Sequence, residues 1–597
     1  MSSVPERSEI DEDYKWDLES IYASDEDWEA AYADVRDRLD DLRVYEGEAT
    51  ADGETLLEVL ELREEIMRQV SMVVAYARMR SHEDTRDQHY QALSARAQSL
   101  SSEADAAASF IEPAIQSLDR DDLDAMIEST DGLGVYEHYL DDVIRLKPHT
   151  RSAEVEALLS DLGEVLSASG EAYNHLLNAD LTFPTVEGPD GDDVEITQSN
   201  FTTLLKEPDR YFRRTVHEAF YDELETVRNT IGSTLKNSVK TDVKLARARN
   251  YESAREAALD GPNIPVTVYD TLVDTVRQHL DTLHRHVELK QRSLGVDELQ
   301  MWDLYMPMTE TESPDITYDE ATGHVVEAMA PLGDEYQSRV AEGLESRWVD
   351  VYENRGKQSG AYSGGTYDTH PFILMNYQED ITSMFTLAHE LGHSLHSEYT
   401  SEHQPYVYSH YEIFTAEVAS TVNETLLTEH LIETVEDERF RRHVLNEYLE
   451  RFRSTLFRQT MFADFEHRIH TMSEAGEALT PDRLDETYRE LKTEFYQPAV
   501  IDDDIAREWS RIPHFFYNYY VYQYATGISA AVALVSDILE EGEPAADRYL
   551  DFLKRGSREY PLELLQDAGV DMADSAPIER AIGVYGHYLD EIASLID

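Results

Sequence analysis

Apolar residues recur at helical spacing through most of this 597-residue chain, and this periodicity constrains the fold more than any other feature. It is clear at residues 56–70, continues through residues 90–127, and returns at residues 200–260 and 266–294. From residue 381 to the end the same spacing dominates. No segment repeats with a period of 20–50 residues, which argues against a repeat architecture. The pattern predicts a mainly α-helical protein with a large buried core.

Two stretches rich in Gly and polar residues interrupt the helical pattern. Residues 181–196 contain two Pro and two Gly and are typical of a hairpin or a linker. Residues 356–365 form the second break, and the apolar run at residues 371–377 suits a short strand. We therefore expect a small sheet and a soft domain boundary, with an N-terminal helical domain at residues 1–195 and a second domain at residues 196–597.

The net charge is extreme. The chain has 51 Lys and Arg against 122 Asp and Glu, a net charge of −71. At about 1 M salt the Debye length falls to roughly 3 Å, which screens the repulsion within such a surface. We interpret the composition as halophilic adaptation to a salt-rich cytoplasm, the alternative being an ordinary acidic protein. Nucleic acid is not expected as a partner, because phosphate binding requires a basic face and none is evident.

The expected location is the cytoplasm, without attachment to a membrane. The first 17 residues are polar and acidic and lack the basic and apolar regions of an export signal. The longest apolar stretch, residues 525–539, is too short to span a bilayer and suits a buried helix. Cysteine is absent, so that disulfides are excluded and any metal must be held by His, Asp or Glu.

The segment 389–393 (HELGH) predicts a catalytic metal site. On a helix His389 and His393 lie one turn apart on the same face, where both imidazoles can bind one ion. Glu390 lies about 100° round the helix, from where it can accept a proton from a metal-bound water without being a ligand. Composition alone produces such a pentapeptide in roughly one chain in ten to twenty, and the alternative is a solvated helix face.

A catalytic zinc requires a third protein ligand and an open fourth position. Glu417 is the better candidate, because it lies among apolar residues on a second expected helix and would be costly to bury without a cation. Glu424, two turns later, is expected to support a ligand His, although it could equally be a surface carboxylate. His396 shares the face of His389 but lies about 10.5 Å along the helix axis, so we expect it to support the site or contact substrate.

A cluster of aromatic residues at 514–527 is the candidate for stabilising negative charge on a substrate oxygen. His514 and neutral Tyr hydroxyls would be suitable donors. Tyr517, Tyr520 and Tyr524 have the spacing of one helix face, which equally fits an amphipathic core helix.

With these segments identified, the chain resembles the thimet-oligopeptidase-type metallopeptidases, and most closely their oligoendopeptidase F branch. The resemblance extends in order over nearly the whole length. The matching stretches are residues 14–18 (YKWDL), 360–369 (GAYSGGTYDT), 389–396 (HELGHSLH), 414–420 (FTAEVAS), 514–527 and 560–565 (YPLELL).

The resemblance implies a zinc-dependent endopeptidase that acts on oligopeptides. It implies a largely helical ellipsoid with a deep substrate channel, a zincin-type catalytic core at residues 196–597 and a small sheet beside the active site. One Zn²⁺ per chain is expected, with His389, His393 and Glu417 as ligands and Glu390 as the base.

The resemblance also assigns expected roles to the neighbouring segments. Tyr362, Gly364 and Gly365 of the Gly-rich loop are expected to contact the substrate backbone together with the strand at residues 372–377. The donors to the transition state are expected to be His514, Tyr517 and Tyr524, while Tyr520 is expected on the substrate side.

Two alternatives remain open at this stage. A C-terminal exopeptidase, such as a dipeptidyl carboxypeptidase, needs a cation for the terminal carboxylate of its substrate. Arg355 and Lys357 are the candidates, although a solvated loop is the favoured interpretation of these two residues. A non-catalytic peptide-binding protein with a structural zinc is less favoured, because it gives Glu390 no role.

Overall fold

The computed structural model describes residues 4–309 and 314–596, and the chain divides into two compact units. Each unit is assembled from three separate segments of the sequence. The first comprises Met1–Lys147, Pro314–Glu433 and Leu534–Gly569, and the second comprises Pro148–Ser313, Thr434–Ala533 and Val570–Asp597. The division at residues 195 and 196 stays a prediction, and that position lies inside the second unit. Among the described residues, no helix combines the length and apolar character needed to cross a bilayer.

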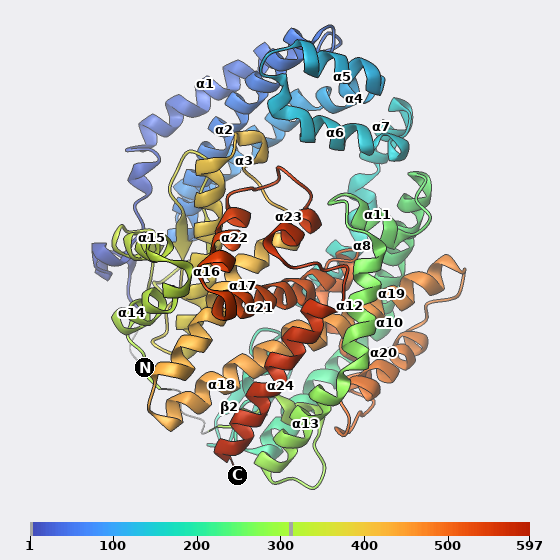
Figure 1. Ribbon diagram of the computed structural model, residues 1–597. Coiled ribbons are helices and arrows are strands. Elements are labelled where there is room, and N and C mark those ends of the chain that lie inside the picture. Colours follow the sequence, from blue (N-terminus) through green and yellow to red (C-terminus); the bar gives the residue numbers. More distant parts are fainter. Residues whose placement is uncertain (1–3, 310–313, 597) are drawn as a thin grey trace. The chain divides into compact units, whose positions relative to one another are not determined.

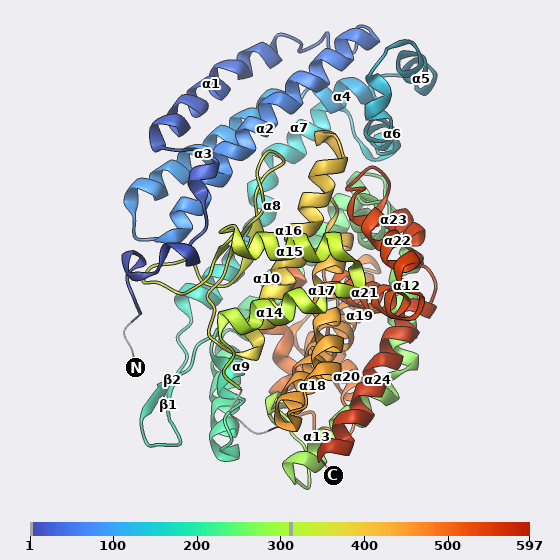
Figure 2. The same ribbon diagram turned by 60° about the vertical axis from the view of Figure 1, so that its left-hand side comes forward.

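Long helices build most of the first unit (Figure 1). They are α1 (Asp25–Arg43), α2 (Gly53–Glu83), α3 (Gln88–Ala108), α4 (Ile111–Gln116), α5 (Arg120–Ser129), α6 (Glu137–Arg145), α14 (Tyr318–Ala328), α15 (Asp334–Glu345), α16 (Ile381–His403), α17 (Ile413–Thr434), α22 (Glu543–Leu553) and α23 (Pro561–Ala568). Helices α1, α2 and α3 lie side by side (Figure 2). Leu56, Val59 and Leu60 of the predicted apolar stripe are buried between them, which confirms the helical interpretation of this region.

The second unit is also helical and includes α10, which is 39 residues long. Its helices are α7 (Ala153–Asp161), α8 (Gly163–His175), α9 (Phe201–Leu204), α10 (Arg210–Ala248), α11 (Ala254–Asp260), α12 (Val266–Gln278), α13 (Leu280–Leu294), α18 (Glu438–Phe452), α19 (Gln459–Glu474), α20 (Pro481–Phe495) and α24 (Ala576–Ile596). The backbone amides of Tyr211 and Phe212 donate to the side chain of Asp209, which caps α10. Helix α21 (Tyr522–Glu541) begins in this unit and continues into the first.

Two small sheets occupy the breaks in the helical pattern. In the second unit, β1 (Thr185–Glu187) and β2 (Asp193–Glu195) form an antiparallel hairpin, as expected for that stretch. In the first unit, β3 (Val349–Asp350), β5 (Phe372–Leu374) and β4 (Tyr362–Gly364) form a sheet in the order β3-β5-β4. Strand β5 pairs in parallel with β3 and antiparallel with β4, so β4 is an edge strand. The predicted strand in the 371–377 run is therefore confirmed.

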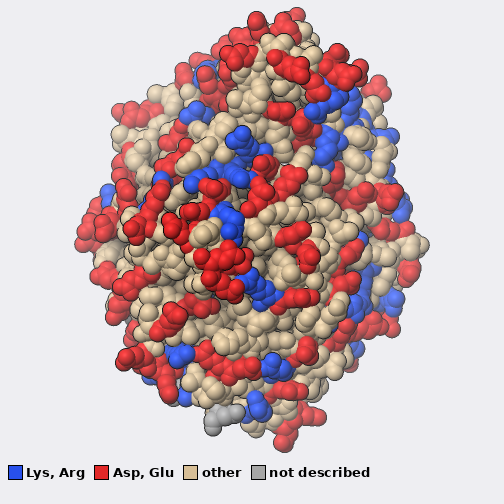
Figure 3. Space-filling model, in the orientation of Figure 1, with Lys and Arg blue, Asp and Glu red and all other residues tan. Residues whose placement is uncertain are grey.

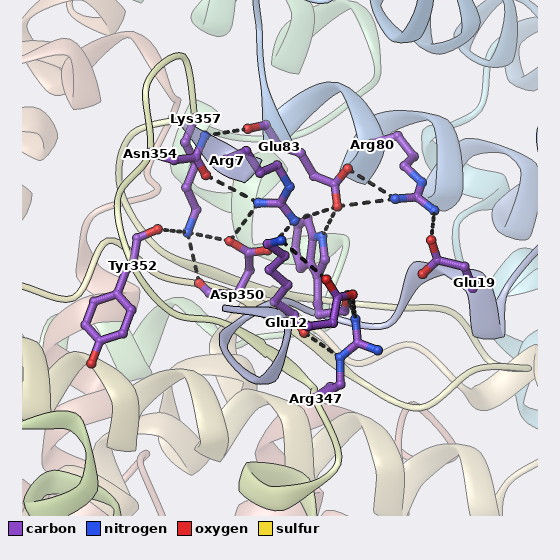
Figure 4. Close-up of polar contacts among 12 residues, drawn as sticks. Arg7, Glu12, Glu19, Arg80, Glu83, Arg347, Asp350, Tyr352, Asn354 and Lys357 are labelled. Atoms are coloured by element: carbon purple, nitrogen blue, oxygen red, sulfur yellow. Dashed lines mark hydrogen bonds and ion pairs between the residues drawn. The ribbon is translucent and has the colours of Figure 1, made fainter. Parts of the chain in front are cut away.

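A buried ion network fixes the chain on one side of this sheet (Figure 4). The carboxylate of Asp350, at the end of β3, forms ion pairs with Arg7 at 2.6 Å and with Lys357 at 2.6 Å. Arg7 also pairs with Glu83 of α2 at 2.7 Å, and Glu83 accepts the indole N–H of Trp16 at 2.8 Å. Burial opposes ionisation of Asp350, but Lys357 and Arg7 hold the pKa of its carboxyl below its usual value. The network therefore ties the N-terminal segment, α2 and the loop after β3 together.

Acidic side chains outnumber basic ones on the face of the molecule that Figure 3 shows. Asp and Glu are spread widely over this face, and Lys and Arg are scattered among them. Many of the Arg side chains of the first unit pair with carboxylates, for example Arg68 with Asp368 and Arg96 with Glu29. This face has no continuous basic patch.

Candidate active site and metal centre

Helix α16 presents the paired histidines. It begins at Ile381, where Asp380 caps it by accepting the backbone amide of Ser383 at 2.7 Å. Most of the helix is buried, but His389 and His393 keep 26% and 19% of their side chains exposed. Their Nε2 atoms lie 3.2 Å apart, which confirms that the two imidazoles share one face.

Helix α17 brings an acidic group to the same point. The Oε2 atom of Glu417 lies 3.6 Å from Nε2 of His389 and 3.9 Å from Nε2 of His393. The hydroxyl of Ser420 donates to this carboxylate at 3.3 Å. All three donor atoms lie within 4.8 Å of one another, as bonds of about 2.0–2.2 Å to one zinc ion require. Two nitrogen donors and one carboxylate therefore fit a catalytic zinc.

Helix α17 supplies a hydrogen-bond partner to each of the two imidazoles. Nδ1 of His389 donates to Oε1 of Glu424 at 2.8 Å, which leaves Nε2 as the metal-facing atom. Burial opposes the charge on His389, but Glu424 raises its pKa above the usual value. Burial lowers the pKa of His393 to about 3, so that its ring is neutral, and the backbone carbonyl of Ala416 accepts a hydrogen bond from it. The expected support by Glu424 is thus seen in the geometry.

Close packing of α16 against α17 requires glycine at position 392 of the motif. A Cβ atom at Gly392 would lie 2.6 Å from the backbone oxygen of Ala419 and 2.6 Å from Cα of Ser420. Both contacts are with backbone atoms of α17, which have little freedom to move. Gly392 therefore permits the close approach of α16 and α17 that brings Glu417 to the histidines.

Glu390 lies on the wall of a cleft of about 520 Å³, which the three candidate metal ligands also line. Only 7% of the residue is exposed, and burial raises the pKa of its carboxyl, against the effects of His389 and of the Ser363 backbone amide. The Ser363 hydroxyl lies 2.8 Å from that of Ser394, which fixes β4 against α16. A nearly buried carboxyl with a raised pKa is suited to accept and return a proton.

Tyr362, Gly364 and Gly365 line the same cleft, as their predicted role requires. The hydroxyl of Tyr362 lies 2.9 Å from Nδ1 of His82, which holds the ring in place. Gly365 has a φ of +136°, a conformation that favours glycine and turns the chain away from β4. Their contact with substrate stays a prediction.

Comparison with known proteins establishes the class of this enzyme. Residues 203–584 match the profile of "Peptidase family M3", and residues 115–183 match that of "Oligopeptidase F". The chain belongs to peptidase family M3. It is an oligoendopeptidase of the F branch, so the predicted family and enzyme class are confirmed.

Relatives over the full length support the assignment to family M3. Oligopeptidase PepF of Bacillus subtilis is 46% identical over 596 residues, which are 100% of this chain and 89% of that protein. The structure of oligoendopeptidase-F from Enterococcus faecium matches with a TM-score of 0.75 and 39% identity, over 96% of this chain and 99% of that one. A structure from Chlamydophila abortus matches with a TM-score of 0.90 and 33% identity, over 99% and 100%. The predicted mainly helical fold with a small sheet beside the site is confirmed.

Of the two expected roles of His396 in the M3 peptidase, its position agrees with support of the site and not with contact with substrate. Its ring is 1% exposed and stacks on Tyr411 with the ring centroids 3.7 Å apart. Tyr411 lines the cleft, where its hydroxyl lies 2.9 Å from that of Ser397. His396 therefore packs behind the cleft wall and does not meet substrate directly. Tyr411 was not predicted, because no spacing rule ties the loop between α16 and α17 to the cleft.

The predicted donors to the transition state all lie in the second unit. The expected helix is wrong for residues 517–521, which form a turn with positive φ at Asn518 and Tyr519, while α21 begins at Tyr522. The turn nevertheless gathers aromatic rings. The four predicted residues have ring centroids 5.4–6.3 Å apart in the pairs His514–Tyr517, His514–Tyr520, His514–Tyr524, Tyr517–Tyr520 and Tyr520–Tyr524. Their catalytic role stays a prediction.

The candidate carboxylate anchors of an exopeptidase are engaged elsewhere. Lys357 is fully buried and bonds to Asp350 and to the backbone oxygens of Asp350 and Tyr352 (Figure 4). It therefore serves the ion network and cannot reach a substrate, which corrects its proposed role. Arg355 lies at the surface, 3.5 Å from Glu6.

Proposed function

We propose that this M3 peptidase uses one Zn²⁺ to hydrolyse internal peptide bonds of oligopeptides. The observation that carries the proposal is the convergence of His389, His393 and Glu417 beside the nearly buried carboxyl of Glu390. A zinc ion held by the three ligands supplies a Lewis acid that polarises a carbonyl and lowers the pKa of water. The family supports a metallopeptidase, and the donor set supports zinc as the metal.

Each protein group near the ligands has a defined task in this proposal. Glu390 accepts the proton of the attacking water and returns it to the leaving amine. Glu424 keeps His389 in the tautomer that faces the metal. The edge strand β4 lines the cleft, so that an extended peptide can pair with its backbone. His514 and a nearby Tyr, with Tyr524 of α21 foremost, donate to the oxyanion.

The decisive test is the conservative variant Glu390→Gln. We expect kcat to fall by about 10²–10⁴, because the amide cannot carry the proton. Zinc content should remain unchanged, because Glu390 is not a ligand. Cleavage of a quenched fluorescent peptide and metal analysis of the same sample measure both. Full activity of this variant would refute the mechanism.

The exopeptidase alternative makes a different prediction about substrates. A peptide blocked at both ends retains internal bonds but offers no terminal carboxylate. We expect this chain to cleave it, and mass mapping of cut sites in a mixed peptide pool measures the pattern. Loss of turnover after treatment with a chelator, restored by Zn²⁺, separates the enzyme from a non-catalytic binding protein.

We also propose that the protein works in a salt-rich cytoplasm. The net charge of −71 and the acidic face in Figure 3 support this proposal. The reason is electrostatic, since molar salt screens repulsion that would otherwise weaken the folded state.

A further inference from the structure

A second group of metal-binding side chains lies in the second unit, outside the site described above. His217 of α10 meets Asp502 and Asp504, which lie in the segment between α20 and the short helix η11 (Ile505–Arg511). One donor atom from each residue lies within 4.8 Å of the other two. Donors that share one ion at bonds of about 2.0–2.4 Å cannot be farther apart than about 4.8 Å, so one cation can reach all three.

His217 is the residue that points to a ligand. It is 1% exposed, and its Nε2 atom is buried with no hydrogen-bond partner in the described part of the chain. Its nearest acidic atom is Oδ2 of Asp502 at 3.5 Å, beyond the usual range of an N–H···O hydrogen bond. A buried imidazole nitrogen with only this long contact is costly, because its desolvation is incompletely repaid. A cation between His217 and the carboxylates removes this cost.

The charge around the group is negative. The two carboxylates of the group, Asp502 and Asp504, lie two residues apart in the sequence. Arg507 opposes their charge, but it is shared between Asp504 and Glu225. The two carboxylates of the group are therefore only partly neutralised.

The group is accessible and already partly organised. Asp502 keeps 36% of its side chain exposed and lies on the wall of an open cleft of about 510 Å³, which gives an ion a path from solvent. Its other oxygen, Oδ1, accepts the backbone amide of Ile505 at 2.8 Å and so caps η11. The side chain of Asp502 is thereby held in place before an ion arrives.

We propose that His217, Asp502 and Asp504 form a second divalent-cation site, separate from the catalytic zinc. One imidazole and two carboxylates suit the borderline ion Zn²⁺ best, and the two carboxylates also suit the harder ion Mn²⁺, whereas Mg²⁺ and Ca²⁺ prefer oxygen ligands throughout. A bound ion would clamp the segment before η11 onto α10 and stabilise the second unit. The chain would then hold two ions, where the motif at His389 predicts one.

Metal stoichiometry tests the proposal on the full chain. The protein is stripped with a chelator and titrated with Zn²⁺ in a calorimeter, and the metal retained after gel filtration is measured. We expect two equivalents for the wild type and one for Asp502→Asn. The Asn side chain keeps an oxygen for the amide of Ile505, so the cap on η11 survives while the ligand charge is lost. A double variant His389→Gln and His393→Gln should retain the one equivalent that Asp502→Asn loses.

Asp503 provides the matched control. It is adjacent in sequence but 91% exposed and paired with Arg489, so Asp503→Asn should retain two equivalents. Mn²⁺ should raise the melting temperature of the wild type and of Asp503→Asn by more than that of Asp502→Asn or Asp504→Asn, because only the site at His389 can still bind it in those two variants. In chelator all four proteins should melt alike, which excludes a general folding defect. A single equivalent in the wild type, or a second equivalent that persists in both ligand variants, would overturn the proposal.

Discussion

At the scale of the residue, the candidate active site depends on two carboxylates of α17 and on a missing side chain in α16. Glu417 and Glu424 lie two helical turns apart on α17, and they meet the two sides of His389. One carboxylate is positioned as a ligand, while the other orients a ligand. The absence of a side chain at Gly392 permits the spacing. Two predictions follow from these contacts.

Glu424→Gln should weaken zinc binding by about 10–100-fold, because outer hydrogen-bond partners tune a metal site by that amount. The amide can still accept from Nδ1 of His389, but it no longer supplies the charge that holds the ring. Competition with a zinc buffer measures the affinity. Glu327→Gln is the matched control, because Glu327 pairs with His430 at 3.6 Å at the surface of the same unit. Equal affinities of the two variants would contradict the role of Glu424.

Gly392→Ala should destabilise the protein by about 3 kcal/mol, at the upper end of the cost of overpacking. The added methyl group would contact backbone atoms of Ala419 and Ser420 at 2.6 Å and push the helices apart. Zinc affinity should fall with it. Urea unfolding measures the free energy. Gly323→Ala in α14 is the control, since nothing lies within 4 Å of its Cβ and the change should be neutral or stabilising by about 0.5–1 kcal/mol.

At the scale of the element, the turn that carries the aromatic cluster is held by a buried carboxyl of α19. Asn518 and Tyr519 have φ values of +25° and +57°, which residues other than glycine rarely adopt. Oε1 of Glu466 accepts the backbone amide of Tyr519 at 2.7 Å. Burial raises the pKa of Glu466 to about 7, partly offset by His470 and assisted by Asp242.

The raised pKa of Glu466 makes the folded protein less stable as the pH rises. Between the ordinary pKa of about 4.5 and about 7, the folded protein keeps the proton on Glu466 while the unfolded chain loses it. The stability contributed by the neutral carboxyl is therefore complete below pH 4.5 and is lost as the pH rises through 7. The difference is on the order of 3 kcal/mol.

Glu466→Gln should therefore gain stability relative to the wild type as the pH rises from 5 to 8. The amide stays neutral and can still accept from the amide of Tyr519. Urea unfolding of both proteins in chelator at the two pH values measures the change, and titrating groups common to both cancel in the difference. A difference that is independent of pH would show that Glu466 titrates near its ordinary value.

At the scale of the whole molecule, the net charge of −71 predicts that stability depends on salt. Self-repulsion weakens the folded state in dilute buffer, and molar salt screens it. We expect the free energy of unfolding to rise from low salt to molar KCl. Choline chloride at equal ionic strength is the control, because it screens charge without a specific alkali-metal site. Equal stability at low and high salt would refute the halophilic interpretation.

The sequence by itself predicted the group of side chains that converges at the candidate metal centre. Helical spacing put His389 and His393 on one face, because a helix returns to that face every four residues. The apolar surroundings of Glu417 made it the candidate for the third ligand, and the structure brings its carboxylate to the two histidines. Helix class, the hairpin and the strand at β5 followed from local periodicity and from Pro and Gly positions.

Only the tertiary structure decided which distant segments meet. The sequence left open whether His396 supports the site or contacts substrate, and packing against Tyr411 buries it. The sequence around Lys357 is typical of an exposed loop, but Lys357 pairs with Asp350 within a buried network. Likewise His217 and Asp502 are nearly 300 positions apart, and no periodicity links them. Local spacing fixes neighbours along one helix, whereas contacts between helices depend on the packing of the whole unit.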